Sequence, residues 1–504
     1  MAIMESAGNK NLLFSGYIGF GLYTLALIAA ALSLPPIALT PGTEQFIFVV
    51  GGLAIWRYSW GLVHFTRAIL YKNIVFPKYR KLEEAHRQEL LPSKIYLLVT
   101  SFRIETDTSL KVFRSVVQEA INTGVECMIV PSLVEKADEA MVKEIFSAMN
   151  PPKHVTLDIV RIPGTGKRDG LAQGFRAISR DMPPFDAVVA VIDGDSVLEP
   201  NLIKKTASFF KMMPEIGALT TDEECDVKGS QLIRSWHSLR FAQRQLLMSS
   251  MGLSKRVLTL TGRMSMFRGS IITESDFIER VQSDHLKHWR FGILRFLTGD
   301  DKSSWYWVLK HGWSMLYVPD VQVHTVEHPP SPDFFIATTM LMKRWFGNML
   351  RTNERALNIP PHVTGFFTWW CLLDQRISMW TSLSGPIFVT MLCFKYSMAF
   401  LAIYFVWIGF TRWIMTLMLL SSRHQTSWTY PFLLYYNQIY GSLIKTYVFF
   451  RLDKQSWTRQ KTTLSGTSNY WDSKITAASS IGLHLASILA FISVIGLVAG
   501  VFHF

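Results

Sequence analysis

One stretch near the middle of the chain, AVVAVIDGDSVLEP, constrains the fold more than any other segment. Small and β-branched apolar residues run from Val188 to Ile192 and stop at Asp193-Gly194-Asp195. A short apolar run bounded by turn residues predicts a buried strand of a parallel sheet. Ligands of open α/β sheets bind at the carboxyl ends of such strands. We therefore expect Asp193 and Asp195 to hold a hard divalent cation that bridges a diphosphate, with a solvated polar loop as the alternative.

The apolar residues, 49% of the 504-residue chain, gather towards its two ends and leave an ordinary α/β pattern between them. No recognisable nucleic-acid motif accompanies the net charge of +13. Basic residues at the ends of apolar spans, together with an anionic substrate, explain this charge better than nucleic acid does. The four cysteines are too widely spaced for a zinc site or a disulfide framework, so we expect buried thiols.

The first 72 residues predict a transmembrane hairpin. Leu12–Leu34 is almost free of charge and long enough to span a bilayer, and Phe46–Leu70 is a second candidate span. Arg57 lies near the middle of the second span, so its side chain should face protein or water instead of lipid. Basic residues on both flanks put the two ends of the hairpin in the cytosol. These residues are Lys10, Lys72, Lys78, Arg80 and Lys81.

Residues 363–504 predict interfacial and transmembrane helices with a cytosolic loop near 451–475. Phe366–Arg376 is short and aromatic, which favours an interfacial helix. Pro431–Phe450 is predicted to be interfacial or re-entrant, because a crossing there would place the basic run 451–461 outside. Five crossings result, with six as the alternative. The predicted spans of this region are Trp380–Phe394, Ala399–Leu420 and Ala477–Phe502.

Residues 73–362 predict one α/β domain between these membrane segments. Apolar strands alternate with helices whose apolar residues recur at helical spacing. That alternation predicts a doubly wound parallel sheet. The predicted strands are Ile95–Val99, Glu126–Pro131, Leu157–Arg161 and Val188–Ile192, and the predicted helices are Leu110–Asn122 and Asp138–Met149.

Two segments of this domain are candidates for binding a nucleotide. Lys167 and Arg168 open a predicted helix within GTGKRDGLAQGFR, where backbone N–H groups and positive charge suit a diphosphate. The Walker A pattern is absent, and a basic helix start without a ligand is the alternative. We also assign Thr100, Ser101 and Glu105, in the polar turn after the first strand, to the nucleotide.

Three later motifs carry further candidate residues. LTGDDKSSW presents Asp300 and Asp301, one of which is a candidate general base. MKRWFGNML holds Arg344, which suits a leaving diphosphate, and Trp345, whose ring face suits a sugar. QSWTRQ, residues 455–460, is a candidate loop over a nucleotide. Solvated acids and membrane-interface anchors are the alternatives.

The order of these motifs, in one domain flanked by membrane segments, resembles the processive membrane glycosyltransferases of family 2: the cellulose, hyaluronan and chitin synthases. The resemblance implies a GT-A-like cytosolic domain and an inverting polymerase. It assigns the metal to Asp193 and Asp195, the catalytic base to Asp301 beside Asp300, the end of QxxRW to Arg344 and Trp345, and the gating loop to Trp457, Thr458 and Arg459.

A closer resemblance is to the family of bacterial alginate polymerases, the catalytic subunits of mannuronan synthase. It covers nearly the whole chain and rests on long segments such as WRYSWGLVHF, IPGTGKRDGLA, LTGDDKSSW and FFRLDKQSWTRQ. It implies GDP-mannuronate as the donor, growing polymannuronate as the acceptor, and Mg²⁺ or Mn²⁺ as the cofactor. It also implies a bacterial inner-membrane location and a co-polymerase subunit that binds cyclic di-GMP.

Two departures from the family patterns concern the substrates. Leu341 stands where QxxRW has its Gln. The acidic pair that helps to hold uracil in UDP-using relatives is missing, with Glu135 or Asp138 as candidate substitutes. Arg240 and Arg244 have the RxxxR spacing of cyclic di-GMP receptors, which we attribute to chance because no DxSxxG accompanies it.

A pocket that selects mannuronate needs a cation beside C5 of the sugar, since hydrogen bonds to charged groups are strong. We expect Arg263 in TGRMS to bind this carboxylate, with His324 in HTVEH as the runner-up. Two alternatives stay open at this point: a synthase that uses a UDP-sugar, and a degenerate transferase that acts as an exporter or scaffold.

Overall fold

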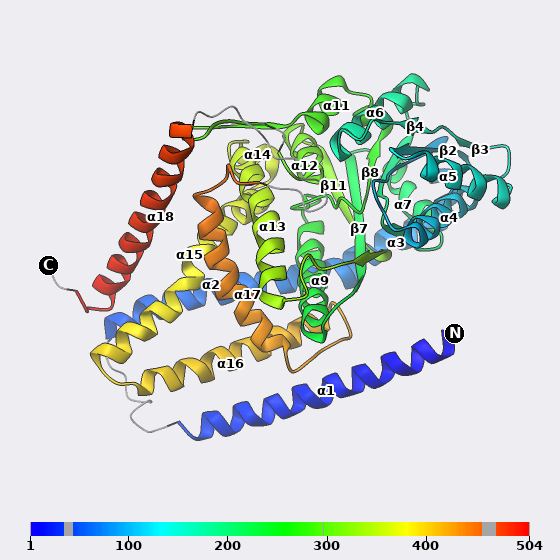
Figure 1. Cartoon of the computed structure of the whole chain (residues 1–504). Coiled ribbons are helices and arrows are strands. Elements are labelled where there is room, and N and C mark those ends of the chain that lie inside the picture. The colour runs from blue at the N-terminus through cyan, green and yellow to red at the C-terminus, as the bar shows by residue number, and fades with distance from the viewer. Residues whose placement is uncertain (1, 35–43, 296, 456–469, 503–504) are drawn as a thin grey trace.

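The computed structural model describes residues 2–34, 44–295, 297–455 and 470–502. Figure 1 shows a sheet covered by short helices on one side of the molecule and a group of long helices on the other. The chain enters through α1 (Ala2–Leu32), α2 (Glu44–Leu70), a π-helical segment η2 (Tyr71–Val75) and α3 (Phe76–Leu90).

The middle of the chain supplies the strands. They are β1 (Lys94–Thr100), β2 (Glu126–Leu133), β3 (Val155–Leu157), β4 (Val160–Arg161), β5 (Val188–Asp193), β6 (Ser196–Leu198), β7 (Ile216–Val227), β8 (Met264–Arg268), β9 (His285–His288), β10 (Gly292–Arg295) and β11 (Ser314–Glu327).

Helices separate these strands and continue beyond them. Those up to β11 are α4 (Thr106–Thr123), α5 (Lys136–Met149), α6 (Lys167–Arg180), α7 (Leu202–Ala207), α8 (Phe209–Met212), α9 (Gln231–Gly252), α10 (Gly269–Ile272), α11 (Ser275–Gln282) and α12 (Asp300–Lys310). Those after it are α13 (Phe334–Leu357), α14 (Pro361–Thr364), α15 (Phe366–Lys395), α16 (Ala399–Leu420), α17 (Tyr430–Phe449) and α18 (Tyr470–Val498).

The main sheet is mixed, whereas the sequence predicted a parallel one. Among the described residues its order is β3-β2-β1-β5-β8-β7-β11-β6, with β4 beside β2. The predicted strands β1, β2 and β5 pair in parallel, but β8 runs antiparallel between β5 and β7. An apolar run predicts a buried strand but carries no information about the direction of its neighbour, which the connections decide. The run 157–161 is divided between β3 and β4.

The edge of the sheet that carries the acids is set by the pairing of β1 with β5. Their register places Thr100 opposite Asp193, so both strands end at the same level. The Gly194 N–H donates to the Thr100 carbonyl oxygen at 2.8 Å. A Cβ at Gly194 would lie 2.8 Å from that oxygen, so only glycine lets the Asp-Gly-Asp turn close against β1.

Four helices of the described chain are long and apolar enough to cross a membrane: Ser15–Leu32 within α1, α15, α16, and Asp472–Val498 within α18. The predicted interfacial helix Phe366–Arg376 and the predicted span Trp380–Phe394 are one continuous helix, α15, which corrects the sequence analysis. The helix runs through Pro386, and the Asp374 carboxylate within it is paired with Arg57 of α2. The hairpin's second crossing, in α2, stays a prediction.

Arg57 confirms the expectation that its side chain faces protein. Its Nη1 atom lies 2.5 Å from Asp374 Oδ1, and its Nε donates to Thr381 Oγ1 at 2.8 Å. These two contacts tie α2 to α15. Of the four cysteines, Cys127 and Cys371 are buried as expected, and the other two are partly exposed.

Candidate functional site

Three segments that are far apart in the sequence meet at the carboxyl end of β5. Lys167, the first residue of α6, places its Nζ atom 2.5 Å from Asp193 Oδ1 and 3.1 Å from Asp300 Oδ2. Asp300 is the first residue of α12. The structure therefore brings the basic helix start, the Asp-Gly-Asp turn and the Gly-Asp-Asp turn into one cluster.

The two acids of the Gly-Asp-Asp turn have different electrostatic surroundings. Burial would raise the pKa of Asp300, but Lys167 and Arg168 outweigh it and hold this pKa below its usual value. Burial and the neighbouring Asp300 raise the pKa of Asp301, and Lys302 and Lys167 only partly oppose them. When their surroundings push the pKa values of two neighbouring acids apart, the two acids commonly have different catalytic roles. The acid with the raised pKa suits proton transfer.

The space beside Asp193 is suited to a cation. A Cβ placed on Gly262 would lie 3.6 Å from Asp193 Oδ2, 3.5 Å from Lys167 Nζ and 3.9 Å from Asp301 Cβ, so glycine keeps this space open. Asp195 follows one residue after the turn glycine and is partly exposed. Two carboxylates with room for further oxygen ligands fit Mg²⁺ or Mn²⁺, whose other ligands are commonly phosphates and water. The described residues hold no cluster of three or more histidine, cysteine or acidic side chains that would complete a metal site without a substrate.

Buried hydroxyl groups line the neighbouring strand ends. Thr100 Oγ1, Ser101 Oγ and Ser132 Oγ have no hydrogen-bond partner among the described residues. Buried polar groups are normally paired, so three unpaired hydroxyls beside the acidic turn indicate that a ligand completes their bonds. Ser132 was not predicted; its position opposite Thr100 in the sheet brings it here. Glu105 lies outside this group, exposed in front of α4.

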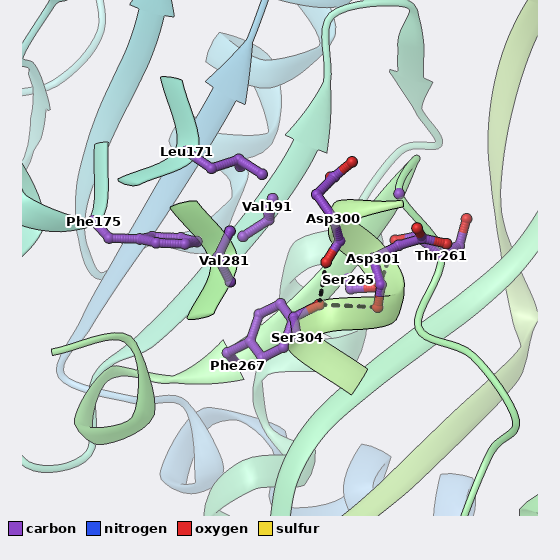
Figure 2. Close-up of a pocket in the computed structure, with 11 residues that line it drawn as sticks. Leu171, Phe175, Val191, Thr261, Ser265, Phe267, Val281, Asp300, Asp301 and Ser304 are labelled. Atoms are coloured by element: carbon purple, nitrogen blue, oxygen red, sulfur yellow. Dashed lines mark hydrogen bonds between the residues drawn. The ribbon is translucent and has the colours of Figure 1, made fainter. Parts of the chain in front are cut away.

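A cavity of about 20 Å³ lies behind the Gly-Asp-Asp turn, which is enough for one water molecule. Figure 2 shows Asp300, Asp301 and Thr261 on one side of it and apolar side chains on the other. Ser304 donates towards the backbone oxygens of Asp300 and Asp301, at 3.3 and 3.1 Å, which anchors the first turn of α12 (Figure 2).

Arg168 does not face the cluster as a free cation, in contrast to the sequence expectation. It is buried, and its guanidinium donates to Leu297 O at 2.7 Å, Val281 O at 2.6 Å and Ser303 Oγ at 2.9 Å. Helical periodicity turns it inward from Lys167, its neighbour in α6. Arg168 therefore holds the loop before α12 in place and leaves Lys167 as the cation beside the acids.

Arg263 is also engaged within the protein. It lies 2.7 Å from Glu223 Oε2 and forms a second ion pair with Glu327. Burial alone would lower the pKa of Arg263, but these two glutamates raise it. A guanidinium already paired with two carboxylates has less capacity for the carboxylate of a sugar, which weakens the predicted role.

His324 is separated from this network. It is exposed and faces Glu224, with 3.7 Å between Nδ1 and Oε2. Side chains alternate along a strand, so His324 lies on the opposite face of β11 from Glu327, three residues away. Arg263 is thus engaged by two carboxylates and His324 lies on the other face of β11, and their assignment to the sugar carboxylate stays a prediction.

Trp345 lies on α13 within an aromatic group. Its ring stacks on that of Trp236, with 5.8 Å between centroids, and the Arg240 guanidinium lies 4.3 Å from the Trp345 centroid. Trp345 stays partly exposed. Burial would raise the pKa of the Glu327 carboxyl, but Arg263, His237 and, to a smaller extent, Arg344 lower it below its usual value.

Sequence reasoning missed Arg351. Its buried guanidinium donates to Thr298 Oγ1 at 2.9 Å, Asn348 Oδ1 at 2.8 Å and Leu452 O at 3.1 Å. A signal was present, because Arg344, Asn348 and Arg351 share one face of α13 by their helical spacing. The predicted gating residues Trp457, Thr458 and Arg459 lie outside the described residues, whereas Gln455, just before them, accepts from the Thr298 N–H at 3.2 Å.

Residues 92–348 match the family described as glycosyltransferase like family 2. The chain belongs to this glycosyltransferase family. A protein of Pseudomonas syringae pv. tomato named glycosyltransferase alg8 is 49% identical over 481 residues, which are 94% of this chain and 98% of that protein. An Azotobacter vinelandii protein of the same name is 46% identical over 480 residues, 94% of this chain and 97% of its own. The chain is accordingly a glycosyltransferase of the alginate-biosynthesis group, and its four apolar helices mark it as a membrane protein.

Two solved glycosyltransferases show a distant likeness. A Pyrobaculum calidifontis mannosyltransferase in complex with GDP-Man and Mn²⁺ has a TM-score of 0.41 and 13% identity, covering 76% of this chain and 98% of that chain. GalNAc-T7 with UDP, GalNAc and Mn²⁺ has a TM-score of 0.32 and 10% identity, covering 53% and 52%. Likenesses at these scores add nothing to the family assignment.

Proposed function

We propose that the chain is a processive, inverting transferase that polymerises mannuronic acid from GDP-mannuronate and passes polymannuronate across the bacterial inner membrane. The observation that carries the proposal is the cluster of Lys167, Asp193, Asp300 and Asp301 at one edge of the sheet. Relatives named glycosyltransferase alg8, at 46% and 49% identity, support the alginate precursor as the product.

Asp301 acts as the general base in this proposal. It takes the proton from the 4-hydroxyl of the acceptor sugar, and the hydroxyl oxygen attacks C1 of the mannuronosyl donor. The bond from C1 to the phosphate oxygen breaks, GDP leaves with the electron pair, and the configuration at C1 inverts. Its raised pKa suits this role, because a base works best when its pKa approaches the operating pH.

Asp193 and Asp195 would hold the divalent cation, Mg²⁺ or Mn²⁺. When bound, such a cation neutralises the charge that develops on a leaving diphosphate. Lys167 adds a positive charge on the same side, held in place by Asp193 and Asp300. The unpaired hydroxyls of Thr100 and Ser101 support a nucleotide at the neighbouring strand ends.

The remaining assignments rest on the resemblance and on charge. Arg344 binds the leaving diphosphate, Trp345 stacks on the acceptor sugar, and Trp457 and Arg459 belong to a gating loop over the donor. The catalytic domain lies in the cytosol, where the basic flanks of the apolar helices place it. A separate co-polymerase subunit that binds cyclic di-GMP activates the enzyme.

A donor screen tests the proposal. The full chain, in membranes with a co-expressed partner, is given GDP-mannuronate, GDP-mannose, UDP-glucose or UDP-N-acetylglucosamine, with and without Mg²⁺. We expect nucleotide release and polymer only with GDP-mannuronate and the metal, and none from Asp301→Asn. Turnover of a UDP-sugar would replace the donor assignment, and the absence of any release would favour an exporter or scaffold.

A further inference from the structure

Two cations near Trp345 have no carboxylate partner among the described residues. Arg240 on α9 makes no ion pair there, and its guanidinium lies over the rings of Trp345 and Trp236, at 4.3 and 5.0 Å from their centroids. Lys445 on α17 makes none either, and its ammonium lies 4.9 Å from the Phe346 ring centroid. Both residues are partly exposed, while burial is the largest effect on both charged groups.

Burial, the largest effect, and repulsion by Arg240 together lower the pKa of Lys445 to about 8 against the opposing effect of Asp374, so Lys445 is still mainly a cation at neutral pH. The nearby acids are already engaged. Glu327 pairs with Arg263, and Asp374 lies 2.5 Å from Arg57. Burial lowers the pKa of Arg240 to about 10, with only partial compensation by Glu327, so the group is still a cation at neutral pH.

Unpaired charges surrounded by protein are costly, and two of the same sign side by side are more so. An arrangement of this kind is favourable when an anion binds between the charges. The anion's chemistry follows from what else lies here: Trp345 and Phe346 are consecutive aromatic residues on α13, each beneath one of the cations. An aromatic face suits the apolar face of a sugar ring, and a guanidinium suits a carboxylate.

The packing of the helices brings these groups together. α17 packs against both α13 and α9, and Figure 1 shows the three helices meeting beside the sheet. Trp236 on α9 stacks behind Trp345 and fixes its ring. The aromatic rings and the two cations thus come from three separate segments of the chain. This separation explains why no sequence motif predicts that they lie together.

We propose that Arg240 and Lys445 form a carboxylate subsite for an anionic sugar chain whose ring docks on Trp345. The subsite rests on the proposed function and deepens it, because it selects a uronate acceptor over a neutral one. The sequence assigned recognition of the sugar carboxylate to Arg263. The two cations lie over Trp345 and Phe346 instead, on the side proposed for the acceptor.

Binding of a matched pair of oligosaccharides tests the subsite. The probes are β-1,4-linked hexamannuronate and β-1,4-mannohexaose, which is its carboxyl-reduced counterpart. The full chain in lipid nanodiscs should bind the charged probe at least about tenfold more tightly at low salt, a difference of ~1.4 kcal/mol. Failure of the wild-type chain to prefer it would overturn the proposal.

Variants distinguish binding by this pair of cations from binding by the general positive charge of the protein. Arg240→Gln and Lys445→Gln should each reduce the preference several-fold, and the double variant should abolish it without changing mannohexaose binding. Arg240→Lys and Lys445→Arg keep the charge and should keep most of the preference. Arg234→Gln, at an exposed position of the same helix, is the matched control and should leave both affinities unchanged.

Three results would overturn the subsite: an unchanged preference in the double variant, equal losses for both probes, or loss of the preference in the charge-retaining variants. GDP release from GDP-mannuronate, measured on the same preparations, keeps the two proposals apart. If the chain releases GDP but does not prefer hexamannuronate, the subsite alone is rejected. If the preference depends on Arg240 and Lys445 but no GDP is released, the donor assignment alone is rejected.

Discussion

At the scale of single residues, neighbours decide what each acid of the site can do. The buried Asp300 faces the Lys167 ammonium at 3.1 Å, whereas Asp301 is partly exposed and lies next to the negative charge of Asp300. The two residues are adjacent and chemically identical, so their different pKa values come from the positions of Lys167 and Arg168. The roles of a base and a charge-balancing acid follow from this difference.

The pH dependence of turnover should report the raised pKa of Asp301. A general base works only when deprotonated, so kcat/KM should fall as the pH decreases through this pKa, at a higher pH than for an ordinary aspartate near 3.9. Asp300→Asn removes a negative neighbour and should move the acid limb to lower pH. Rate profiles of both proteins measure the shift, and an acid limb that moves upward in the variant would contradict the role of Asp300.

Asp195→Asn should abolish polymer formation while the protein stays folded. The substitution removes one of two carboxylates from a proposed hard-cation site, and amide oxygen is a much weaker ligand for Mg²⁺. Asp226→Asn, an exposed acid of β7, is the control and should keep full activity. Activity and thermal unfolding are measured for both. Wild-type turnover of Asp195→Asn at ordinary Mg²⁺ would remove Asp195 from the metal site.

Arg263→Ala should destabilise the protein more than it changes selection of the sugar. It leaves Glu223 and Glu327 without their shared cation, and breaking a buried ion pair costs about 3–5 kcal/mol. Arg263→Lys should recover part of the loss. The midpoint of thermal unfolding decides the matter. An unchanged midpoint combined with weaker use of GDP-mannuronate would restore the role that the sequence suggested.

At the scale of elements, α13 connects the base to the segment that follows α17. Arg351 donates hydrogen bonds to both Thr298 Oγ1 and the Leu452 carbonyl oxygen. Thr298 directly precedes the Gly-Asp-Asp turn. Thr298 also donates to Asn348 Oδ1 at 2.5 Å. A planar guanidinium can hold several oxygen atoms in fixed directions, and no other side chain offers this geometry. The position of Asp301 therefore depends on a side chain in another element.

Arg351→Met should lower turnover at least about tenfold, an effect of ~1.4 kcal/mol, with little change in KM for the donor. The reason is a displaced base with intact donor contacts. Arg351→Lys should recover only part of the rate, and Lys343→Met, an exposed change on α13, should have no effect. Steady-state GDP release provides both constants. A rise in KM at unchanged kcat would show that Arg351 serves the donor.

At the scale of the whole molecule, orientation in the membrane follows from which helix ends lie together. Lys395, at the end of α15, bonds to the Gly500 carbonyl oxygen beyond α18, which places these two ends on one side. Figure 1 shows both on the side away from the sheet. The segment 451–455 lies on the other side, where Gln455 contacts Thr298.

Cysteine labelling tests this orientation. Lys454→Cys, in a background with Cys225→Ser and Cys393→Ser, should react with an impermeant thiol reagent only from the cytosolic face, because basic loops stay in the cytosol. Met398→Cys, at the exposed turn between α15 and α16, is the opposite-side control and should react from the periplasm. Periplasmic labelling of position 454 would invert the proposed topology and separate the segment 451–455 from a cytosolic donor.

Sequence alone determined the parts of this protein that depend on local pattern. The apolar run before Asp193 specified a buried strand, the acidic turn specified a candidate cation site, and the long motifs specified the family. The apolar helices near both ends were visible for the same reason, because the length and composition of a span are properties of a continuous segment.

Tertiary structure alone decided the direction of β8 and the continuity of α15. It also decided which basic side chains are neutralised by partners within the protein. Arg168, Arg263 and Arg240 look alike in the sequence, but two are satisfied by distant carbonyl or carboxylate oxygens and one is not. The physical reason is that electrostatic partners are set by distance in space. The partners that bind the guanidinium groups of Arg168 and Arg263 lie 40 to 135 positions away in the chain, and no local pattern records them.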